Sequence, residues 1–307
     1  MSRMPCPQPR KRHQLASELP PGVHPASAAE AFERVRPWLG RRLLLATDFD
    51  GTVSRLAMDP WQAGIVPSAQ RALRRLAVAP RTDVAFISGR TVPDLAARAR
   101  VGGVGYYGDH GAEWAQAPRG FRPAALRPQH EAVDPAVAAM ARRVREEVPR
   151  RVDEPWLVVE DKGPAVTFHF RAAPDTDAAR VLVRAAVAEI DRDGLLDQPG
   201  GRRAWELRPP GATTKGVALA RLIKQHQPGL VLMLGDDRHD AEAFDTVRAA
   251  RRTDGLEGLA VAVVSPAADT AEMAGRADLV FADADVTARF LTLLSRVRST
   301  STRTAST

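Results

Sequence analysis

The 307-residue sequence contains one cysteine, Cys6, which excludes an intrachain disulfide framework and any zinc site built on several cysteines. No uninterrupted apolar run reaches the roughly 20 residues that a membrane-spanning helix needs. The first fourteen residues also lack the apolar segment of a secretory signal peptide. We therefore expect a cytoplasmic protein that has no membrane partner.

Lysine is also scarce, because only four of the 44 basic residues are lysines: Lys11, Lys162, Lys215 and Lys224. Arginine and lysine are not interchangeable where a site needs a compact ammonium group. A lysine inside a motif of this chain therefore carries extra weight.

The formal net charge of +7 comes from the two ends of the chain. The first fourteen residues carry +4 and the last twelve carry +3, from Arg3, Arg10, Lys11, Arg12, Arg296, Arg298 and Arg303. A nucleic-acid-binding protein carries its basic residues on a folded face. We therefore expect no nucleic-acid partner and two disordered tails, residues 1–24 and 299–307, which could make weak, salt-sensitive contacts.

The order of apolar runs and helical patterns predicts an α/β fold with a second, smaller domain. Continuous apolar runs indicate buried parallel strands at 42–47, 83–87, 104–107 and 230–234, and shorter strands at 260–264 and 279–281. Helical patterns separate them, at 68–78, from Pro93 onward, and at 214–225, 240–249 and 286–297. A further helix follows a capping box of Ser27 and Glu30 and stops at Pro37.

The pattern changes in the middle of the chain. Helices at 134–148 and 175–190 alternate with strands at 156–160, 165–170 and 203–207, which is typical of an α+β module with an antiparallel sheet. We expect a Rossmann-like core in two parts, residues 25–112 and 209–298. An inserted α+β cap domain would cover residues 113–208.

The segment Asp48-Phe49-Asp50-Gly51-Thr52 follows the first predicted strand. Ligands of open α/β sheets bind beyond the carboxyl ends of the strands, so both aspartates should stand at the mouth of a site. Two carboxylates this close need a cation to offset their repulsion, and Mg²⁺ is the usual one. The alternative is an ordinary turn, since Asp and Gly are common turn residues.

Polar groups of the required kinds also stand at other strand ends and at a helix start. They are Ser88, Lys215, Asp236, Asp237 and Asp240. A carboxylate can attack phosphorus, a second acid can move the protons, and a hydroxyl and an ammonium can hold the phosphoryl oxygens. Taken singly, Ser88 could lie in a plain loop, Lys215 on a solvated helix, and Asp236-Asp237 in a capping turn.

Together these residues resemble the haloacid-dehalogenase-like phosphatases, and within them the trehalose-6-phosphate phosphatases, over about residues 40 to 295. The resemblance implies that Asp48 is the nucleophile and Asp50 the acid/base. It implies that Mg²⁺ is held by Asp48, the backbone carbonyl of Asp50 and Asp236, with support from Asp237 and Asp240. It also implies phosphoryl contacts from Ser88 and Lys215, with Gly89 and Arg90 beside them in substrate binding.

The narrower resemblance rests on the segments Gly108-Asp109-His110-Gly111, Glu160-Asp161-Lys162, His169-Phe170-Arg171 and Glu206-Leu207-Arg208-Pro209. It implies that Glu160, Lys162 and Glu206 bind the sugar, whereas Glu160 and Lys162 could instead form an exposed ion pair of little worth. His110 is equally compatible with substrate binding and with an ordinary loop. The fourth motif departs from the family pattern, because His239 replaces a threonine and Ala241 a glutamate.

We expect a monomeric, Mg²⁺-dependent phosphatase acting on a small-molecule sugar phosphate, trehalose 6-phosphate first. Sucrose phosphate or a glycosyl-phosphoglycerate would keep the chemistry and change the sugar. A non-catalytic sugar-phosphate sensor is the third possibility, and the presence of Asp48 argues against it.

Overall fold

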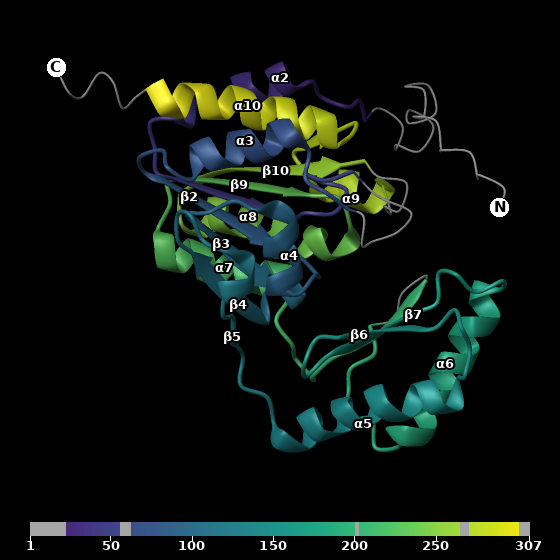
Figure 1. Cartoon of the computed structure of the whole chain (residues 1–307). Coiled ribbons are helices and arrows are strands. Elements are labelled where there is room, and N and C mark those ends of the chain that lie inside the picture. Colours follow the sequence, from purple (N-terminus) through teal and green to yellow (C-terminus); the bar gives the residue numbers. More distant parts are fainter. Residues whose placement is uncertain (1–22, 56–62, 200–202, 265–269, 301–307) are drawn as a thin grey trace. The chain divides into compact units, whose positions relative to one another are not determined.

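The computed structural model describes residues 23–55, 63–199, 203–264 and 270–300, and divides the chain into two compact units. The first unit is formed by the chain up to Gln129 together with the chain from Thr214 onward, and the second by His130–Thr213 (Figure 1). Residues 1–22 and 301–307, which hold most of both predicted tails, lie outside the described residues.

Among the described residues, eight strands form the sheet of the first unit, in the order β11-β10-β9-β1-β2-β3-β4-β5. Their bounds are β1 Leu43–Thr47, β2 Thr82–Ile87, β3 Val104–Gly108, β4 Glu113–Ala117, β5 Gln129–His130, β9 Leu230–Gly235, β10 Glu257–Val263 and β11 Leu279–Phe281. The strands from β11 to β3 pair in parallel, and β4 runs antiparallel to β3. The predicted α/β class and parallel core sheet are confirmed.

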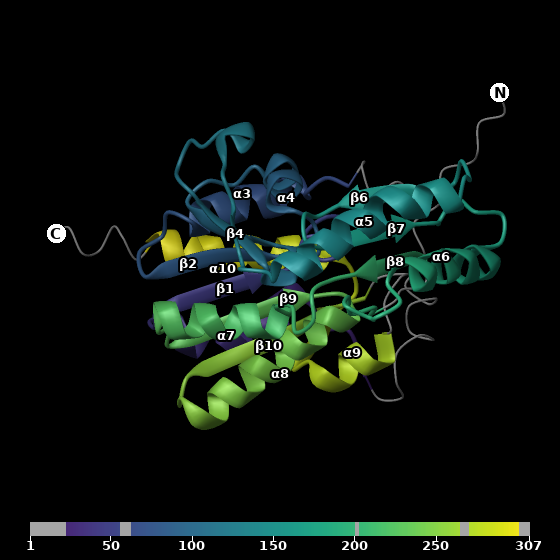
Figure 2. The same ribbon diagram turned by 90° about the horizontal axis from the view of Figure 1, so that it is seen from below.

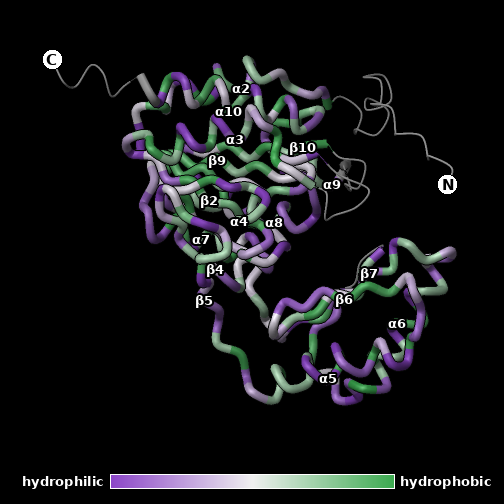
Figure 3. The backbone as a smooth tube through the Cα atoms, viewed as in Figure 1, coloured by the Kyte–Doolittle hydropathy of each residue, from purple (hydrophilic) through white to green (hydrophobic). Residues whose placement is uncertain are grey.

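The central strand β1 shows why both faces of this sheet are covered. All five of its residues are buried, and its leucines alternate between the two core clusters on the sheet's faces. One face packs on α2 Ala28–Val35, α3 Pro67–Leu76, α4 Val92–Ala99 and α10 Ala284–Thr300, and the other on α7 Lys215–His226, α8 Arg238–Thr253 and α9 Thr270–Arg276 (Figure 2). In Figure 3 hydrophobic residues follow the inner strands. Short 3₁₀ helices cover Arg36–Trp38, Asp109–Gly111 and Pro123–Ala125.

The chain ends follow the predictions in part. The capping box of Ser27 and Glu30 is present at the start of α2. The last helix, α10, extends to Thr300, beyond the predicted residue 297, and Arg298 is buried within it. Arg298, which was counted with the basic end of the chain, therefore belongs to the folded core, as the predicted core bounds of 209–298 imply.

The second unit consists of a three-stranded antiparallel sheet and two helices. The strands are β6 Val158–Asp161, β7 Val166–His169 and β8 Ala204–Leu207, in that order across the sheet. The helices α5 Pro135–Arg151 and α6 Thr176–Ile190 share a hydrophobic core with one face of this sheet, which includes Phe168 and Leu207. The predicted α+β module is present.

The bounds of the second unit differ from the predicted 113–208. Residues 113–117 form β4, which pairs with β3 in the first unit's sheet, so the second unit begins only at His130 and ends at Thr213. The sequence contained no strong apolar run at β4, because this strand alternates buried and partly exposed residues. The helix α9 was also missed.

Candidate active site

The site is built on the end of β1, which lies between β2 and β9. Asp48 follows β1 directly, and its backbone N–H donates to the carbonyl of Leu234 on β9 at 2.8 Å. Lys215 opens α7, and its Nζ donates to Oδ1 of Asp48 at 2.9 Å and to Oδ1 of Asp240 at 2.8 Å. The three side chains are at least 95% buried. The structure thus brings a predicted nucleophile, ammonium and support residue together.

Three buried carboxylates form the part of the site that could hold a metal. One oxygen each from Asp48, Asp236 and Asp240 lies within 4.8 Å of the others. Carboxylate oxygens are the ligands that hard divalent cations prefer, and a cation here would offset the repulsion among the three negative charges. The donor set therefore fits a Mg²⁺-type ion.

Gly51 is required at the turn after the two aspartates. Its φ of +73° lies in the left-handed region, and a Cβ placed there would be 2.0 Å from Oδ2 of Asp236. The close approach of this backbone allows Asp236 to reach the site. Thr52 adds a hydroxyl oxygen 3.5 Å from Oδ1 of Asp236.

Burial is the largest influence on the pKa values of this cluster, followed by the attraction between Lys215 and the carboxylates. Burial raises the pKa of Asp48 to about 6, although the neighbouring Lys215 ammonium acts to lower it. Burial likewise raises the pKa of Asp240 well above its ordinary value, against the lowering effect of Lys215. For Lys215, burial acts to lower the pKa, but the surrounding carboxylates outweigh it and raise the pKa. One ammonium is thus shared by several acids.

Asp237 and Asp240 also begin the helix α8. Asp237 is its N-cap, and its Oδ1 accepts from the N–H groups of His239 and Asp240. Oδ2 of Asp240 accepts from the N–H groups of Asp236 and Asp237, each at 3.1 Å. The capping interpretation of this segment is correct for Asp237, while Asp240 both caps the helix and binds Lys215.

Asp50 faces a different partner. Its carboxylate is held by the guanidinium of Arg90, Nε to Oδ2 at 2.6 Å and Nη2 to Oδ1 at 2.8 Å. Arg90 also donates through Nη1 to Asp94 at 2.6 Å, and Arg98 donates through Nε to both oxygens of Asp94 at 2.8 Å. The sequence motifs gave roles to Asp50 and Arg90 but none to Asp94 and Arg98. The spacing of four residues from Arg90 to Asp94 and on to Arg98 was the available signal.

Ser88, Gly89 and His110 lie together where β2 and β3 end. The backbone N–H of His110 donates to the carbonyl of Ser88 at 2.9 Å. A Cβ on Gly89 would lie 3.0 Å from Cε1 of His110, so the imidazole packs directly on this glycine. His110 has a φ of +58°, and its ring centroid lies 4.6 Å from that of His239. His239, one of the two departures from the family pattern, therefore packs on His110. Ala241, the other departure, lies on α8 and is buried in the hydrophobic core.

In the second unit, the candidate residues Glu160 and Glu206 lie on one face of the sheet. Glu160 on β6 and Glu206 on β8 are aligned across the sheet through Thr167 on β7. Nζ of Lys162 donates to Oε1 of Glu206 at 3.3 Å, and Oε2 of Glu160 lies 2.8 Å from Nε2 of His169. The side chains of Lys162 and Glu206 are only 6% and 11% exposed, so this is not the exposed ion pair considered above.

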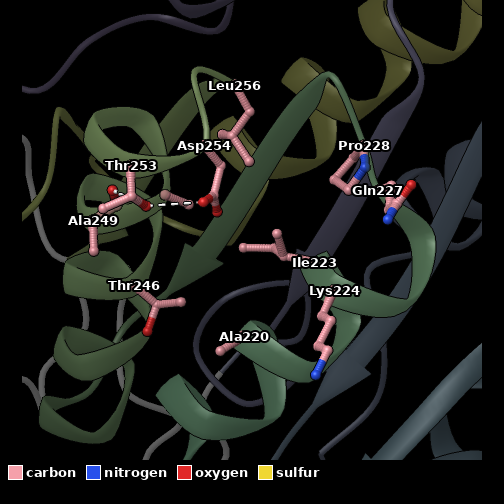
Figure 4. Close-up of a pocket in the computed structure, with 11 residues that line it drawn as sticks. Ala220, Ile223, Lys224, Gln227, Pro228, Thr246, Ala249, Thr253, Asp254 and Leu256 are labelled. Carbon is pink, nitrogen blue, oxygen red and sulfur yellow. Dashed lines mark hydrogen bonds between the residues drawn. The ribbon is translucent and has the colours of Figure 1, made fainter.

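A hollow of about 600 Å³ lies between α7 and α8, away from this chemistry (Figure 4). It is lined near the far ends of both helices by residues such as Ile223, Gln227 and Asp254. Lys215 and Asp237 stand at the opposite ends of the same helices. The hollow is therefore separate from the carboxylate site.

None of the helices within the described residues is both long and apolar enough to cross a membrane.

Comparison with known proteins places the chain in a family. A curated trehalose-phosphate phosphatase of Mycolicibacterium paratuberculosis is 37% identical over 214 residues, which are 68% of this chain and 52% of that protein. A longer protein of Mycobacterium tuberculosis, described as an uncharacterized glycosyl hydrolase, is 35% identical over 216 residues, 68% of this chain but 16% of its own length. The chain thus spans about half or less of the length of these relatives.

Solved structures show the same fold. The C-terminal domain of a trehalose-6-phosphate phosphatase from C. albicans covers 90% of this chain and 99% of its own, with a TM-score of 0.68 at 19% identity. A haloacid dehalogenase-like hydrolase of Bacteroides thetaiotaomicron covers 83% of this chain and 98% of its own, with a TM-score of 0.56 at 15% identity. The sequence profile of trehalose-phosphatases matches residues 46–276, which is more than half of the sequence. The chain belongs to the trehalose-phosphatase family.

Proposed function

We propose that this protein hydrolyses trehalose 6-phosphate to trehalose and phosphate through a phosphorylated aspartate. The observation that carries the proposal is the buried contact of Lys215 with both Asp48 and Asp240, beside Asp236. It combines a nucleophile, an ammonium for the phosphoryl oxygens and a cluster able to hold a divalent cation. Family membership supports trehalose 6-phosphate as the substrate.

The first half of the reaction uses both aspartates of the 48–52 segment. Asp48 attacks phosphorus, the bond from phosphorus to the sugar oxygen breaks, and Asp50 gives its proton to that oxygen. Ser88 and Lys215 hold the phosphoryl oxygens as charge develops on them. Trehalose leaves, and Asp48 carries the phosphoryl group.

The second half restores the enzyme. Asp50 takes a proton from a water molecule as its oxygen attacks the phosphorus carried by Asp48, the bond from phosphorus to the Asp48 oxygen breaks, and phosphate leaves. Asp48, the backbone carbonyl of Asp50 and Asp236 would hold Mg²⁺, with Asp240 and Asp237 fixing the surrounding backbone and Lys215. When bound, Mg²⁺ supplies positive charge that offsets the repulsion between carboxylates and phosphate.

Sugar recognition is assigned to Glu160, Lys162 and Glu206 of the second unit. Recognition of a polyol needs paired donors and acceptors, and these residues supply one ammonium and two carboxylates on one sheet face. A site of this kind rejects phosphate esters that lack the matching hydroxyls.

Phosphate release from a panel of sugar phosphates, with Mg²⁺ and with chelator, tests the proposal. We expect Mg²⁺-dependent release from trehalose 6-phosphate and loss of that release in Asp48→Asn. Release from sucrose phosphate or a glycosyl-phosphoglycerate instead would keep the mechanism and change the substrate. If the folded protein releases phosphate from no member of the panel, the proposed activity is wrong and a non-catalytic sugar-phosphate sensor becomes the leading hypothesis.

A further inference from the structure

The pairing of Arg90 with Asp50 has the geometry of an orienting contact. Two parallel hydrogen bonds, at 2.6 and 2.8 Å, join the guanidinium to both oxygens of the carboxylate. Bidentate pairing of this kind fixes the distance and the plane of a carboxylate, which a single bond does not. The Arg90 side chain is 11% exposed, and its guanidinium carbon lies 5.9 Å from the ring centroid of the buried Phe49.

Two residues of α4, Asp94 and Arg98, hold the Arg90 side chain in place. Its Nη1 donates to Asp94, a first-turn residue of α4, and Arg98 on the next turn donates to both oxygens of Asp94. Arg98 also donates to the carbonyl of Ala63 at 3.1 Å. Asp50, Arg90, Asp94 and Arg98 thus form a row of contacts with alternating charge, and the net charge of the four side chains is zero. These contacts connect the Asp50 carboxylate to α4, whose residues Leu95, Ala96 and Ala99 are buried in the core.

Asp50 is thereby kept apart from the metal-type cluster. The carboxylates whose oxygens lie within 4.8 Å of one another are Asp48, Asp236 and Asp240, among the described residues. Asp50 is only two residues from Asp48, yet its oxygens are bound by Arg90.

We propose that Arg90 is a positioning residue that orients Asp50 for proton transfer, rather than a ligand of the substrate. This inference rests on the proposed phosphatase function. Each carboxylate oxygen has two lone pairs, and the guanidinium uses one on each, so one remains for a proton. When Asp50 gives its proton to the leaving oxygen, the carboxylate that results is stabilised by Arg90. In the second half-reaction the same orientation aims that carboxylate at the attacking water.

The test uses aryl phosphates, which carry no sugar and whose leaving phenols differ in acidity. A good leaving group such as 4-nitrophenol departs without a proton, whereas phenol needs one. For Arg90→Gln we expect kcat/KM to fall about threefold with 4-nitrophenyl phosphate and about 100-fold with phenyl phosphate. Arg90→Lys, which keeps the charge and loses the bidentate geometry, should show a smaller difference of the same sign.

Arg74→Gln on α3, whose side chain binds the carbonyl of Arg100, is the matched control and should behave as wild type with both esters. Adding Arg90→Gln to Asp50→Asn should cost nothing further with 4-nitrophenyl phosphate, because Arg90 acts through Asp50. Circular dichroism would verify that each variant is folded.

If the wild type is active, three results would overturn the role of Arg90 without affecting the proposed function. In Arg90→Gln, kcat/KM could fall equally with all esters, or KM could rise with kcat unchanged. In the double variant, the losses from Arg90→Gln and Asp50→Asn could be fully additive. A folded wild type that releases no phosphate from any ester would overturn the proposed function and this role together.

Discussion

The Nζ atom of Lys215 lies 2.9 Å from Oδ1 of Asp48, and both side chains are at least 95% buried. The same Nζ also donates a hydrogen bond to Oδ1 of Asp240, whose side chain is fully buried. A buried ammonium that serves two buried carboxylates is an arrangement in which removal of the cation leaves uncompensated charge. Both stability and activity should therefore depend on this one side chain.

Lys215→Met should lower the free energy of unfolding by about 3 kcal/mol in chelator and reduce kcat at least about 100-fold. Added Mg²⁺ should restore part of the stability, because the carboxylates regain a cation, but not the activity. Lys224→Met changes an exposed lysine on the same helix and serves as the control. Urea unfolding and phosphate release would measure both effects, and equal behaviour of the two variants would contradict the assignment.

The raised pKa of Asp48 predicts a pH dependence of stability in the metal-free protein. The pKa is about 6 in the folded state against an ordinary value of 3.8, so the folded state binds the proton more tightly. Stability from this group is therefore present at low pH and lost as pH rises from about 4 to about 6. The loss amounts to about 3 kcal/mol, at 1.36 kcal/mol per pKa unit.

Asp48→Asn removes this titration. In chelator, the variant should gain stability over wild type as pH rises from 4.5 to 7, although it has no phosphatase activity. Asp245→Asn, at a half-exposed surface ion pair, should not show this gain. Parallel curves of unfolding free energy against pH for wild type and Asp48→Asn would show that Asp48 does not titrate in this range.

Gly51→Ala should damage the metal cluster through a steric collision. The new Cβ would fall 2.0 Å from Oδ2 of Asp236, in addition to the strain of a φ of +73°. We expect the Mg²⁺ concentration needed for half-maximal activity to rise about tenfold or more, because Asp236 is displaced. Gly255 has a similar φ of +63° with nothing within 4 Å of its Cβ position. Gly255→Ala therefore isolates the backbone strain, and an equal effect of both changes would exclude the collision.

Lys162→Ala should reduce kcat/KM for trehalose 6-phosphate about tenfold or more, with little change for 4-nitrophenyl phosphate. The reason is that Lys162 supplies a nearly buried donor to the polar face of the second unit. Asp161, the exposed last residue of β6, is next to Lys162 in the sequence and forms an ion pair with Arg145. Asp161→Ala should affect neither substrate. Equal losses with both esters would remove Lys162 from sugar recognition.

The core sheet and its strand-end residues could be predicted because both follow from short-range patterns. Buried parallel strands are continuous apolar runs, and strand ends of such a sheet converge, which places Asp48 beside the site of Asp236 and Asp240. Pattern does not give side-chain direction. The sequence resemblance placed Arg90 in substrate binding, and it did not predict that the guanidinium of Arg90 contacts Asp50 and Asp94.

The edge of the core was predicted less well than its centre. β4, which lies between β3 and the two-residue β5, was not predicted because it alternates buried and partly exposed residues, and its polar residues resembled the start of the cap. The burial of Arg298 was not predicted because this residue precedes a run of Ser and Thr that indicates disorder. Only the tertiary structure shows that its charge is enclosed by backbone carbonyls.

Arg298 connects the C-terminal part of α10 to the segments that lead into β1 and β2. Its guanidinium donates to the carbonyls of Leu39, Arg41, Pro80 and Arg81 and to Oγ1 of Thr82. The residue is 6% exposed, so Arg298→Met should remove a buried charged donor that several carbonyls share. The Arg81 carbonyl keeps the N–H of Leu43 and the Pro80 carbonyl keeps the hydroxyl of Thr82, so the loss comes from the charged hydrogen bonds themselves. We expect the free energy of unfolding to fall by about 2–4 kcal/mol, with KM for the phosphate ester unchanged.

Arg296→Met alters an exposed arginine two residues earlier on the same helix and should change stability by less than about 0.5 kcal/mol. Urea unfolding of both variants gives the comparison. The difference distinguishes two origins for the stabilising effect of this chain end. A buried donor acts at one position and is insensitive to salt, whereas a basic surface acts through total charge and weakens with salt. Equal, salt-sensitive losses in both variants would therefore assign the effect to charge.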